Sequence, residues 1–566
     1  MMKVLLWLLV VAVVTHQQTE NTVKIELQQG VIIGSREEAD AGRFIYSFKG
    51  IPYAEPPVGD LRMKDPLPAG GWTGERNGTE DPPVCKQIDI VALFKDEEAV
   101  VGDEDCLFLN VFTPRPYSSD LPVMVYIHGG AFILGSMIGC GPLPLLNKDV
   151  VLVAIQYRLG VLGFLSTEDE VLPGNLGLKD QTVALRWVQE NIRSFGGDPE
   201  KVTIFGESAG SASVHFQILT PHAAGLFQQA IMQSGTALCP WALREDHKEV
   251  AVTLGEMYTC SDAESPDLDS NRLLDCLNEV PVDDLILSQL KFFKWGNFPW
   301  MTLPRVDGNF LLDHPASMLS AGRYNKVNIM AGINLDEGSI IVIDLFSQKR
   351  KTDLNMLNAT FPKYSPVVLG FEEWEERPEY LAQRVFHHYL GGDIDLTEGQ
   401  FHLLSQMFGD RFIKTCHEDA AYFHSQNKDW NVYLYELRHQ GQQNLPDALT
   451  GSPSGGNGKV NHGDDLQYLF SGMPPFQPLQ HSGDLFLSEI MVDLWTNFAA
   501  TGNPTPDGSL GFRWTPATKD NMTFLSLTTV PIMDKEGNQE IQEFWRNLPT
   551  KQNKLLFPER FIKDKA

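Results

Sequence analysis

Basic residues are scarce in this 566-residue chain. It has 45 lysines and arginines against 73 aspartates and glutamates, which gives a formal net charge of −28. Proteins that bind nucleic acid or anionic membranes need clustered Lys and Arg to contact phosphate, so the composition argues against both partners. Hydrophobic residues make up 43 % and charged residues 21 %, as in an ordinary globular protein rather than a disordered one.

Long hydrophobic runs are equally scarce. The run at residues 4–14 follows a short basic segment and is too short for a stable transmembrane helix. This layout predicts a cleaved signal peptide over residues 1–16, with a buried N-terminal strand as the alternative. No second run of about 18 apolar residues follows, and residues 559–566 carry neither an ER-retention signal nor a hydrophobic tail for a lipid anchor. We therefore expect a secreted protein without a membrane anchor.

Cysteine is also infrequent, with seven in the whole chain. An odd count leaves at least one thiol free or paired between chains. Local spacing suggests the pairs Cys85–Cys106 and Cys260–Cys276, each of which would close a loop of about twenty residues and stabilise the fold by ~3 kcal/mol. A free cysteine is most often a buried small hydrophobic residue, and the three that remain for this role are Cys140, Cys239 and Cys416.

Three N-glycosylation sequons agree with secretion. They begin at Asn77, Asn358 and Asn521, whereas a fourth match at Asn503 is excluded because a proline follows it. Each sequon is a short pattern that also arises by chance, so the three asparagines are candidate acceptors rather than assigned ones.

The chain shows neither an internal repeat nor a long linker, and we expect a single domain over residues 17–566. A helical pattern at residues 178–194 is followed by a pair of glycines that would end the helix. Apolar runs predict buried strands at residues 123–127, 150–155, 201–205, 326–330 and 431–437. This alternation predicts an α/β fold with a large, mostly parallel central sheet flanked by helices on both faces.

Residues 206–210 read Gly-Glu-Ser-Ala-Gly and lie between a predicted strand and a helical run at residues 211–219. Glycines on both sides of Ser208 allow a sharp strand-to-helix turn, where a larger side chain would clash. The turn would expose the Ser208 hydroxyl above the sheet edge, and the N-terminus of the following helix favours developing negative charge. The pentapeptide alone occurs by chance, but this context makes Ser208 the candidate nucleophile.

A second glycine pair, in the segment His-Gly-Gly-Ala-Phe at residues 128–132, directly follows a predicted strand. Small residues let backbone N–H groups approach the oxygen of a tetrahedral intermediate. We predict an oxyanion hole formed by the N–H groups of Gly130 and Ala131, with Ala209 as third donor. A glycine pair alone is usually a turn, and its place ahead of the Ser208 turn favours the functional interpretation.

A serine hydroxyl needs a base to remove its proton, and the base needs a carboxylate to orient it. The expected chain order for this fold is serine, acid, histidine. Among 14 histidines, His462 stands in a cluster with two aspartates, and Asp336 and Glu337 follow a predicted strand. Spacing alone neither chooses between Asp336 and Glu337 nor excludes Asp464 and Asp465.

A series of segments occurs along the chain in an order typical of a known family: residues 48–57, 104–110, 174–181, 195–199, 206–210, 233–235, 336–338 and 462–463. Together they resemble the type-B carboxylesterases of the α/β-hydrolase superfamily, the group that contains carboxylesterases, cholinesterases and juvenile hormone esterases. The similarity covers nearly everything after the expected signal peptide.

The resemblance implies a role for each candidate residue. Ser208 would be the nucleophile, Glu337 the triad acid and His462 the base. Ser234 would hydrogen-bond near the acid, and Glu207 would be an ionised neighbour of the site.

The resemblance also bears on residues outside the site. The two local cysteine pairs match two disulfides of the family. Cys416 resembles one half of a third bridge found in cholinesterases, but residues 542–545 hold no partner cysteine, so this third bridge is predicted to be absent. Arg158 and Asp180 resemble a buried ion pair that braces the sheet behind the site.

The implied reaction is hydrolysis of carboxylic esters through an acyl-enzyme, which needs no metal or organic cofactor. Cholinesterases hold a quaternary ammonium on a tryptophan between the first two cysteines, but here residues 86–105 contain Phe94 and no tryptophan. This argues against acetylcholine. Trp241 resembles an acyl-pocket position, and a core aromatic is the alternative. Juvenile hormone esterases usually have glutamine before the nucleophile, where this chain has Glu207.

The sequence therefore predicts a secreted serine carboxylesterase that acts on small-molecule, apolar esters. A juvenile hormone or pheromone-type esterase is a narrower alternative. A non-catalytic adhesion protein is a third, although such proteins usually need a membrane anchor and all triad positions here are filled. Nothing in the sequence indicates an oligomeric state.

Overall fold

The computed structural model describes residues 21–562, apart from residues 40–41, 90–98, 119, 261–268, 372–374, 393, 451–457 and 536–538. The expected signal peptide at residues 1–16 and Phe94 lie outside the described residues.

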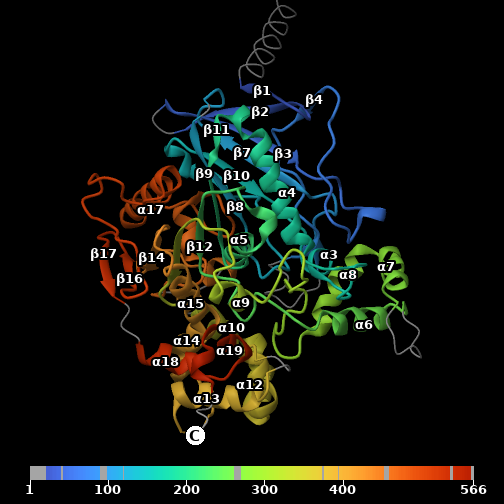
Figure 1. Cartoon of the computed structure of the whole chain (residues 1–566), viewed down its shortest axis with the longest axis vertical. Helices are drawn as coiled ribbons and strands as arrows, with labels where there is room; N and C mark the ends of the chain where they lie inside the picture. Colours follow the sequence, from blue (N-terminus) through green and yellow to red (C-terminus); the bar gives the residue numbers. More distant parts are fainter. Residues whose placement is uncertain are drawn as a thin grey trace, which may run out of the picture.

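One 13-stranded sheet forms the centre of the molecule (Figure 1). Its strands are β1 (Thr22–Leu27), β2 (Gly30–Glu38), β3 (Phe44–Pro52), β4 (Glu75–Asn77), β7 (Phe108–Thr113), β8 (Leu121–Ile127), β10 (Val151–Ile155), β11 (Gly197–Glu207), β12 (Gln229–Gln233), β13 (Asn328–Asn334), β14 (Val432–Leu437), β16 (Thr523–Leu527) and β17 (Ile532–Lys535). Two short antiparallel pairs lie outside it: β5 (Gln87–Ile88) with β6 (Val100–Val101), and β9 (Gly141–Pro144) with β15 (Phe470–Ser471).

The strand order in the sheet is β1-β2-β3-β7-β10-β8-β11-β12-β13-β14-β16-β17, with β4 beside β2. All pairs from β10 to β16 are parallel, and antiparallel pairs occur on either side of them. The predicted α/β fold with a large, mostly parallel sheet is therefore confirmed.

Helices cover both faces of the sheet, and others, such as α12 and α13, lie beyond its lower end in the view of Figure 1. They are α3 (Gly160–Phe164), α4 (Leu176–Asn191), α5 (Ala209–Leu219), α6 (His247–Met257), α7 (Ser270–Glu279), α8 (Val282–Ser288), α9 (Pro315–Ser320), α10 (Ser339–Leu345), α11 (Lys351–Ala359), α12 (Phe361–Val368), α13 (Pro378–Leu390), α14 (Phe401–Gly409), α15 (Thr415–His424), α16 (Leu445–Thr450), α17 (Ser482–Thr501), α18 (Gln539–Arg546) and α19 (Lys551–Leu556).

The central strand β8 shows how the two faces are buried. Val123 and Val125 belong to a core that includes residues of α4 and α5, whereas Met124 and Tyr126 belong to a second core with residues of α17. Successive side chains of a strand point to opposite faces, so the apolar run of β8 has to be covered on both sides.

The predicted strands and helices are present, but some of their ends differ. β13 continues to Asn334, past the predicted end at residue 330. Gly332 interrupts the apolar pattern there, yet a Cβ at this position would lie 2.1 Å from the ring of Tyr435. The glycine thus allows close packing against β14, and the longer strand brings Glu337 to the sheet edge.

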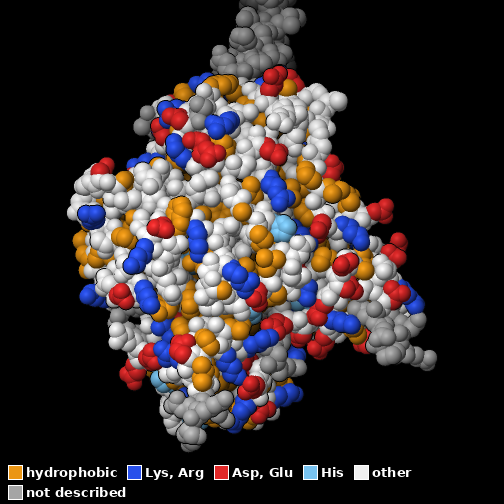
Figure 2. All heavy atoms as spheres, in the orientation of Figure 1, with side chains coloured by type: hydrophobic (Ala, Val, Ile, Leu, Met, Phe, Trp, Pro, Cys, Tyr) orange, Lys and Arg blue, Asp and Glu red, His pale blue; other side chains and the backbone are white. Residues whose placement is uncertain are grey.

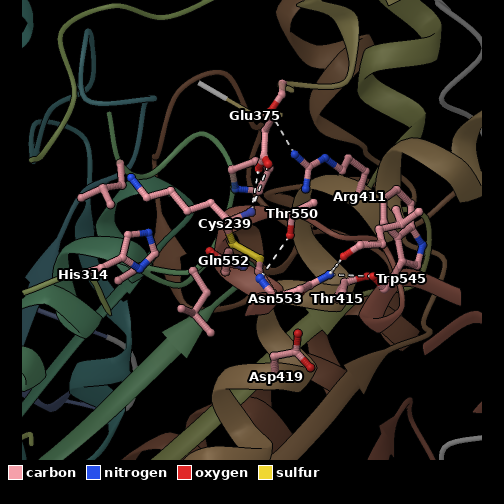
Figure 3. Close-up of a pocket in the computed structure, with 18 of the residues that line it drawn as sticks. Cys239, His314, Glu375, Arg411, Thr415, Asp419, Trp545, Thr550, Gln552 and Asn553 are labelled. Carbon is pink, nitrogen blue, oxygen red and sulfur yellow. Dashed lines mark hydrogen bonds between the residues drawn. A yellow bond between two sulfur atoms is a disulfide. The ribbon is translucent and has the colours of Figure 1, made fainter. Parts of the chain in front are cut away.

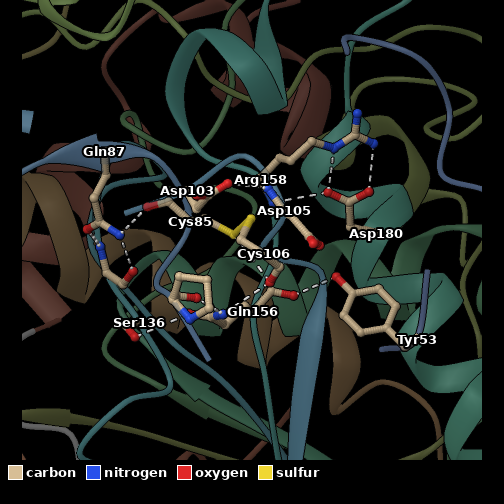
Figure 4. Close-up of a disulfide and its surroundings, with 12 residues drawn as sticks. Tyr53, Cys85, Gln87, Asp103, Asp105, Cys106, Ser136, Gln156, Arg158 and Asp180 are labelled. Atoms are coloured by element: carbon tan, nitrogen blue, oxygen red, sulfur yellow. Dashed lines mark hydrogen bonds and ion pairs between the residues drawn. A yellow bond between two sulfur atoms is a disulfide. The ribbon is translucent and has the colours of Figure 1, made fainter. Parts of the chain in front are cut away.

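Arg158 forms a buried ion pair with Asp180 of α4 (Figure 4). Nη2 of Arg158 lies 2.7 Å from Oδ1 of Asp180, Nε lies 2.8 Å from Oδ2, and the two side chains are 3 % and 0 % exposed. The predicted brace is thus present. Removing either partner would leave a buried charge unpaired, at a cost of about 3–5 kcal/mol.

The disulfides correct one prediction. The two locally spaced pairs, Cys85–Cys106 and Cys260–Cys276, are both bridged. Cys416, expected to lack a partner, is bridged to Cys239, which lies 177 residues earlier in the chain. Cys239 follows β12 and Cys416 stands at the start of α15, so the fold brings together cysteines that local spacing could not pair. Cys140 is free and buried.

The surface carries charges of both signs, and acidic and basic side chains are interspersed on the face shown in Figure 2. Of the sequon asparagines, Asn77 and Asn521 are exposed, whereas Asn358 is partly buried and its Oδ1 accepts a hydrogen bond from the backbone N of Leu396 at 3.1 Å. Among the helices in the described part of the chain, none has the length and hydrophobicity needed to span a bilayer.

Candidate active site

Ser208 lies at a sharp turn between β11 and α5. Its φ of 58° and ψ of −123° are a strained conformation for a residue with a side chain. The backbone N of Ser208 donates to the carbonyl of Gln233 at 2.8 Å. A Cβ at Gly206 would lie 2.5 Å from the carbonyl oxygen of Ile127, and a Cβ at Gly210 would lie 2.1 Å from the same atom. Both glycines are therefore needed for the turn that the sequence predicted.

The glycine-rich loop after β8 packs directly on this turn. A Cβ at Gly129 would lie 3.1 Å from the Cβ of Ser208. Gly130 and Ala131 line the same cavity as Ser208. Ala209 begins α5, so its N–H is one of those that a helix leaves without an intrahelical acceptor. The structure thus gathers the three predicted oxyanion-hole residues around Ser208.

Gln87, on β5, holds the far end of the same loop. Its Nε2 donates to the carbonyl of Gly135 at 2.9 Å, and its Oε1 accepts from the backbone N of Gly135 at 2.7 Å. Figure 4 shows Gln87 close to the Cys85–Cys106 disulfide. Gln87 could not be identified from the sequence, because a single glutamine two residues after a cysteine forms no recognisable pattern.

His462 lies between two buried carboxylates. Its Nδ1 is 2.7 Å from Oε2 of Glu337, and its Nε2 is 3.1 Å from Oε1 of Glu207. Ser208, Glu337 and His462 line one cavity. The fold therefore brings together three residues from separate parts of the chain.

Glu337 is held in place by donors on its other oxygen. Oε1 accepts from the hydroxyl of Ser234 at 2.5 Å and from the backbone N of Asn334 at 2.7 Å. Burial raises the pKa of Glu337, but the charge and hydrogen bond of His462, with the two other donors, outweigh burial and lower the pKa. The carboxylate therefore stays ionised opposite the imidazole.

The other carboxylates that spacing left open have different contacts. Asp336 and Asp464 accept hydrogen bonds from backbone N–H groups of the loop that carries His462. Asp465 accepts a hydrogen bond from a buried glutamine side chain. Of these four acids, Glu337 is the one hydrogen-bonded to the imidazole.

The buried carboxylates favour the protonated form of His462. Burial alone lowers the pKa of His462, but the charges of Glu207, Glu337 and Asp465 outweigh burial and raise the pKa above its ordinary value. Burial in turn raises the pKa of Glu207, and the nearby imidazolium charge opposes this effect. Glu207 and Glu337 are thus the two neighbours whose charges raise the pKa of His462 most.

Comparison with known proteins agrees with this geometry. A family model described as "Carboxylesterase family" matches residues 20–545. A juvenile hormone esterase from Tribolium castaneum is 37 % identical over 530 residues, 90 % of this chain and 88 % of the relative. Esterase FE4 from Myzus persicae is 34 % identical, covering 90 % of this chain and 89 % of the relative. An acylcarnitine hydrolase from Mus musculus is also 34 % identical, covering 90 % and 88 %.

The chain belongs to the carboxylesterase family. As a member of it, the protein is a carboxylic ester hydrolase. In the described part of this carboxylesterase, no group of three or more His, Cys, Asp or Glu side chains is arranged to hold a metal ion.

The cavity of this carboxylesterase above Ser208 has a volume of about 260 Å³ and mainly apolar walls. Six aromatic side chains contribute to it: Trp241, Trp295, Phe298, Trp300, Phe408 and Phe412. The acidic residue Asp344 also lines the cavity, but it is paired with Arg350 at 3.0 Å and Lys349 at 3.2 Å. Sequence analysis singled out Trp241 alone, because the other rings come from distant segments that no motif connects.

Proposed function

We propose that this carboxylesterase hydrolyses esters with Ser208 as nucleophile, His462 as general base and Glu337 as the acid that orients the imidazole. The main support is one contact, the 2.7 Å hydrogen bond between Nδ1 of His462 and Glu337. A carboxylate at Nδ1 keeps the proton there, so in the neutral imidazole Nε2 carries the lone pair that can accept the serine proton.

Acylation follows from these roles. His462 removes the proton of Ser208 as the hydroxyl attacks the ester carbonyl. The N–H groups of Gly130, Ala131 and Ala209 then stabilise the oxyanion, each by about 2.7–4 kcal/mol. Because these donors are fixed by the backbone, they need no reorganisation when the charge develops.

Departure of the alcohol completes acylation, and deacylation then uses the same groups with water as the nucleophile. His462 gives its proton to the leaving alcohol, which departs and leaves an acyl-enzyme on Ser208. A water molecule then takes the place of the alcohol, and His462 removes its proton as the water attacks the acyl carbonyl. The carboxylic acid leaves, and the serine regains its proton.

The position of Glu207 beside His462 predicts an effect on the pH dependence of kcat/KM. His462 accepts the serine proton only when neutral, so kcat/KM rises with pH as His462 loses its proton. The Glu207→Gln variant removes a charge that raises the pKa of His462, and the acid limb of kcat/KM is expected to shift to lower pH by about one unit. A pH profile with p-nitrophenyl acetate measures this. An acid limb that stays in place or moves to higher pH would contradict the electrostatic role of Glu207.

The substrates we propose are apolar esters. The aromatic cavity above Ser208 supports this choice, since neither acidic side chain of its lining is left to bind a cation: Glu337 is hydrogen-bonded to His462, and Asp344 is paired with basic residues. A juvenile hormone or pheromone-type esterase is a second candidate, and the 37 % identity to a juvenile hormone esterase favours it. Glu207, in the position where that subfamily usually has glutamine, favours the broader function. We further propose secretion, with glycans at the exposed Asn77 and Asn521.

A comparison of kcat/KM across acyl and alcohol chain lengths tests the substrate class. We expect kcat/KM to increase with the length of the apolar chain and to be low for acetylcholine. Juvenile hormone belongs in the same panel, where a preference of about 100-fold or more over simple alkyl esters would favour the narrower candidate. Preference for acetylcholine over neutral esters of the same size would contradict the proposal.

A further inference from the structure

The Cys239–Cys416 disulfide belongs to a group of three links between two segments that are distant in sequence. Its two Cα atoms lie 5.0 Å apart, with a sequence separation of 177. Beside it, the hydroxyl of Thr236 donates to the carbonyl of Cys416 at 3.2 Å. Nε1 of Trp241 donates to the carbonyl of Phe412 at 2.9 Å. The disulfide and the two hydrogen bonds thus connect two segments, and each segment contributes one aromatic residue, Trp241 or Phe412, to the substrate cavity.

The first of the two segments is fixed to the nucleophile. The backbone N of Ala237 donates to Nδ1 of His215, on α5, at 3.0 Å. A Cβ at Gly235 would lie 2.5 Å from the carbonyl oxygen of Ser208 and 3.1 Å from Cη2 of Trp241. The Trp241 ring therefore lies close to the backbone of Ser208, where the ester must bind.

The second segment contains a π-helical turn, η9 (Asp410–Lys414), between α14 and α15. Such turns are rare within helices and often occur at functional sites. Phe412 in this turn lines the substrate cavity and stacks with Phe298, with ring centroids 6.0 Å apart, and with Phe408 at 6.2 Å. The π-turn therefore supplies an aromatic side of the cavity that adjoins the segment carrying Trp241.

Two further cavities border the π-turn and the residue that follows it. Arg411 and Thr415 line a separate polar cavity of about 90 Å³, and Figure 3 shows the Cys239–Cys416 disulfide among the residues around it. Lys414 lines a third cavity, of about 450 Å³. The Phe412 ring itself is buried in the core, whereas its neighbours Arg411 and Lys414 border these cavities and have fewer packing partners on those sides. The disulfide therefore adds a covalent restraint to a turn that is packed on one side only.

We propose that the Cys239–Cys416 disulfide determines substrate specificity by holding Trp241 and Phe412 together as a rigid wall beside Ser208. The proposal rests on the proposed function, because the wall selects which ester group reaches the serine. When the bridge is cut, the π-turn is free to move toward the polar cavity, and the substrate cavity then accepts a bulkier group. The disulfide is a positioning element and takes no part in the chemistry.

The Cys239→Ser/Cys416→Ser double variant tests this, with Cys260→Ser/Cys276→Ser as the matched control. The control removes a bridge that packs in a different hydrophobic cluster from Trp241 and Phe412. Rates are measured for p-nitrophenyl acetate, butyrate and pivalate, and for acetates of linear and branched alcohols. In one of the two series, we expect the kcat/KM ratio of branched to linear substrate to rise about fivefold or more, mainly through a lower KM. The control should keep the wild-type ratios.

Active-site titration with an organophosphate gives the concentration of correctly folded enzyme, and each rate is divided by that concentration. Wild-type ratios in both series of the titrated double variant would overturn the proposal. If the double variant does not fold, wild-type enzyme is reduced with a dithiol, and each disulfide is followed by quenched alkylation and peptide mass. The change in ratio should follow opening of Cys239–Cys416, and unchanged ratios after its opening would overturn the proposal. Failure of wild-type enzyme to react with the organophosphate would instead count against the proposed function.

Discussion

Replacing Ser208 by alanine is expected to lower kcat/KM for p-nitrophenyl acetate by about 10⁴-fold or more. The acyl-enzyme forms on the hydroxyl of Ser208, so its removal eliminates the covalent route. What remains is the modest acceleration that an oxyanion hole and substrate binding provide without a nucleophile. Ser208→Ala adds no atoms to a turn that tolerates none at its flanking glycines, so we expect the fold to be retained.

Ser213→Ala is the matched control for this variant. Ser213 is also buried and lies on α5, but its hydroxyl accepts a hydrogen bond from the side chain of Gln181 at 3.0 Å and does not line the substrate cavity. We expect its kcat/KM to stay within about tenfold of wild type. Equal rates for wild type and Ser208→Ala would mean that ester hydrolysis does not use this serine, and would contradict the proposed function.

Replacing Glu337 by glutamine is expected to lower kcat by about 10⁴-fold. A glutamine side chain can donate a hydrogen bond to Nδ1 of His462, where the carboxylate can only accept one. Donation to Nδ1 stabilises the tautomer that carries its proton on Nε2, and this form cannot take the proton of Ser208. The loss of the carboxylate also removes the charge that stabilises the imidazolium. Steady-state kinetics with a saturating ester measure the change in kcat.

The neighbouring residue provides the comparison for Glu337→Gln. Asp336→Asn removes one carboxylate charge from the same loop, but Asp336 contacts the backbone N of Val460 at 3.0 Å rather than the imidazole. Its kcat should fall by less than about tenfold. If Asp336→Asn were the more damaging of the two substitutions, Glu337 would not be the triad acid.

The Ser208 turn could be predicted because its causes are local. A strand, a glycine on each side of one serine, and a helix occupy consecutive residues, and the structure shows why both glycines are required. The residues alone could not decide whether Asp336 or Glu337 is the acid. Both acids follow β13, and which one faces His462 depends on where that strand ends. The end at Asn334 depends in turn on packing between Gly332 and Tyr435, which the linear pattern does not contain.

Contacts between distant segments could not be predicted from the sequence. Local spacing correctly paired the four cysteines whose partners lie nearby, but it missed Cys239–Cys416, because that bridge closes only after β12 and α15 have come together. The substrate cavity has the same origin. Its rings, such as Trp241, Trp295 and Phe412, come from separate elements, and no periodicity links them. Local chemistry was therefore predictable, whereas the shape of the cavity followed from tertiary packing.

The central claim is that Ser208 is the nucleophile that forms the acyl-enzyme, and covalent labelling tests it most directly. Wild-type protein is incubated with an organophosphate until hydrolysis of p-nitrophenyl acetate stops, then digested, and its peptides are analysed by mass. We expect one phosphoryl group per chain, on Ser208, with labelling in proportion to the activity lost. Complete inhibition with the phosphoryl group on another residue, or a labelled Ser208 in protein that still hydrolyses the ester, would contradict the central claim.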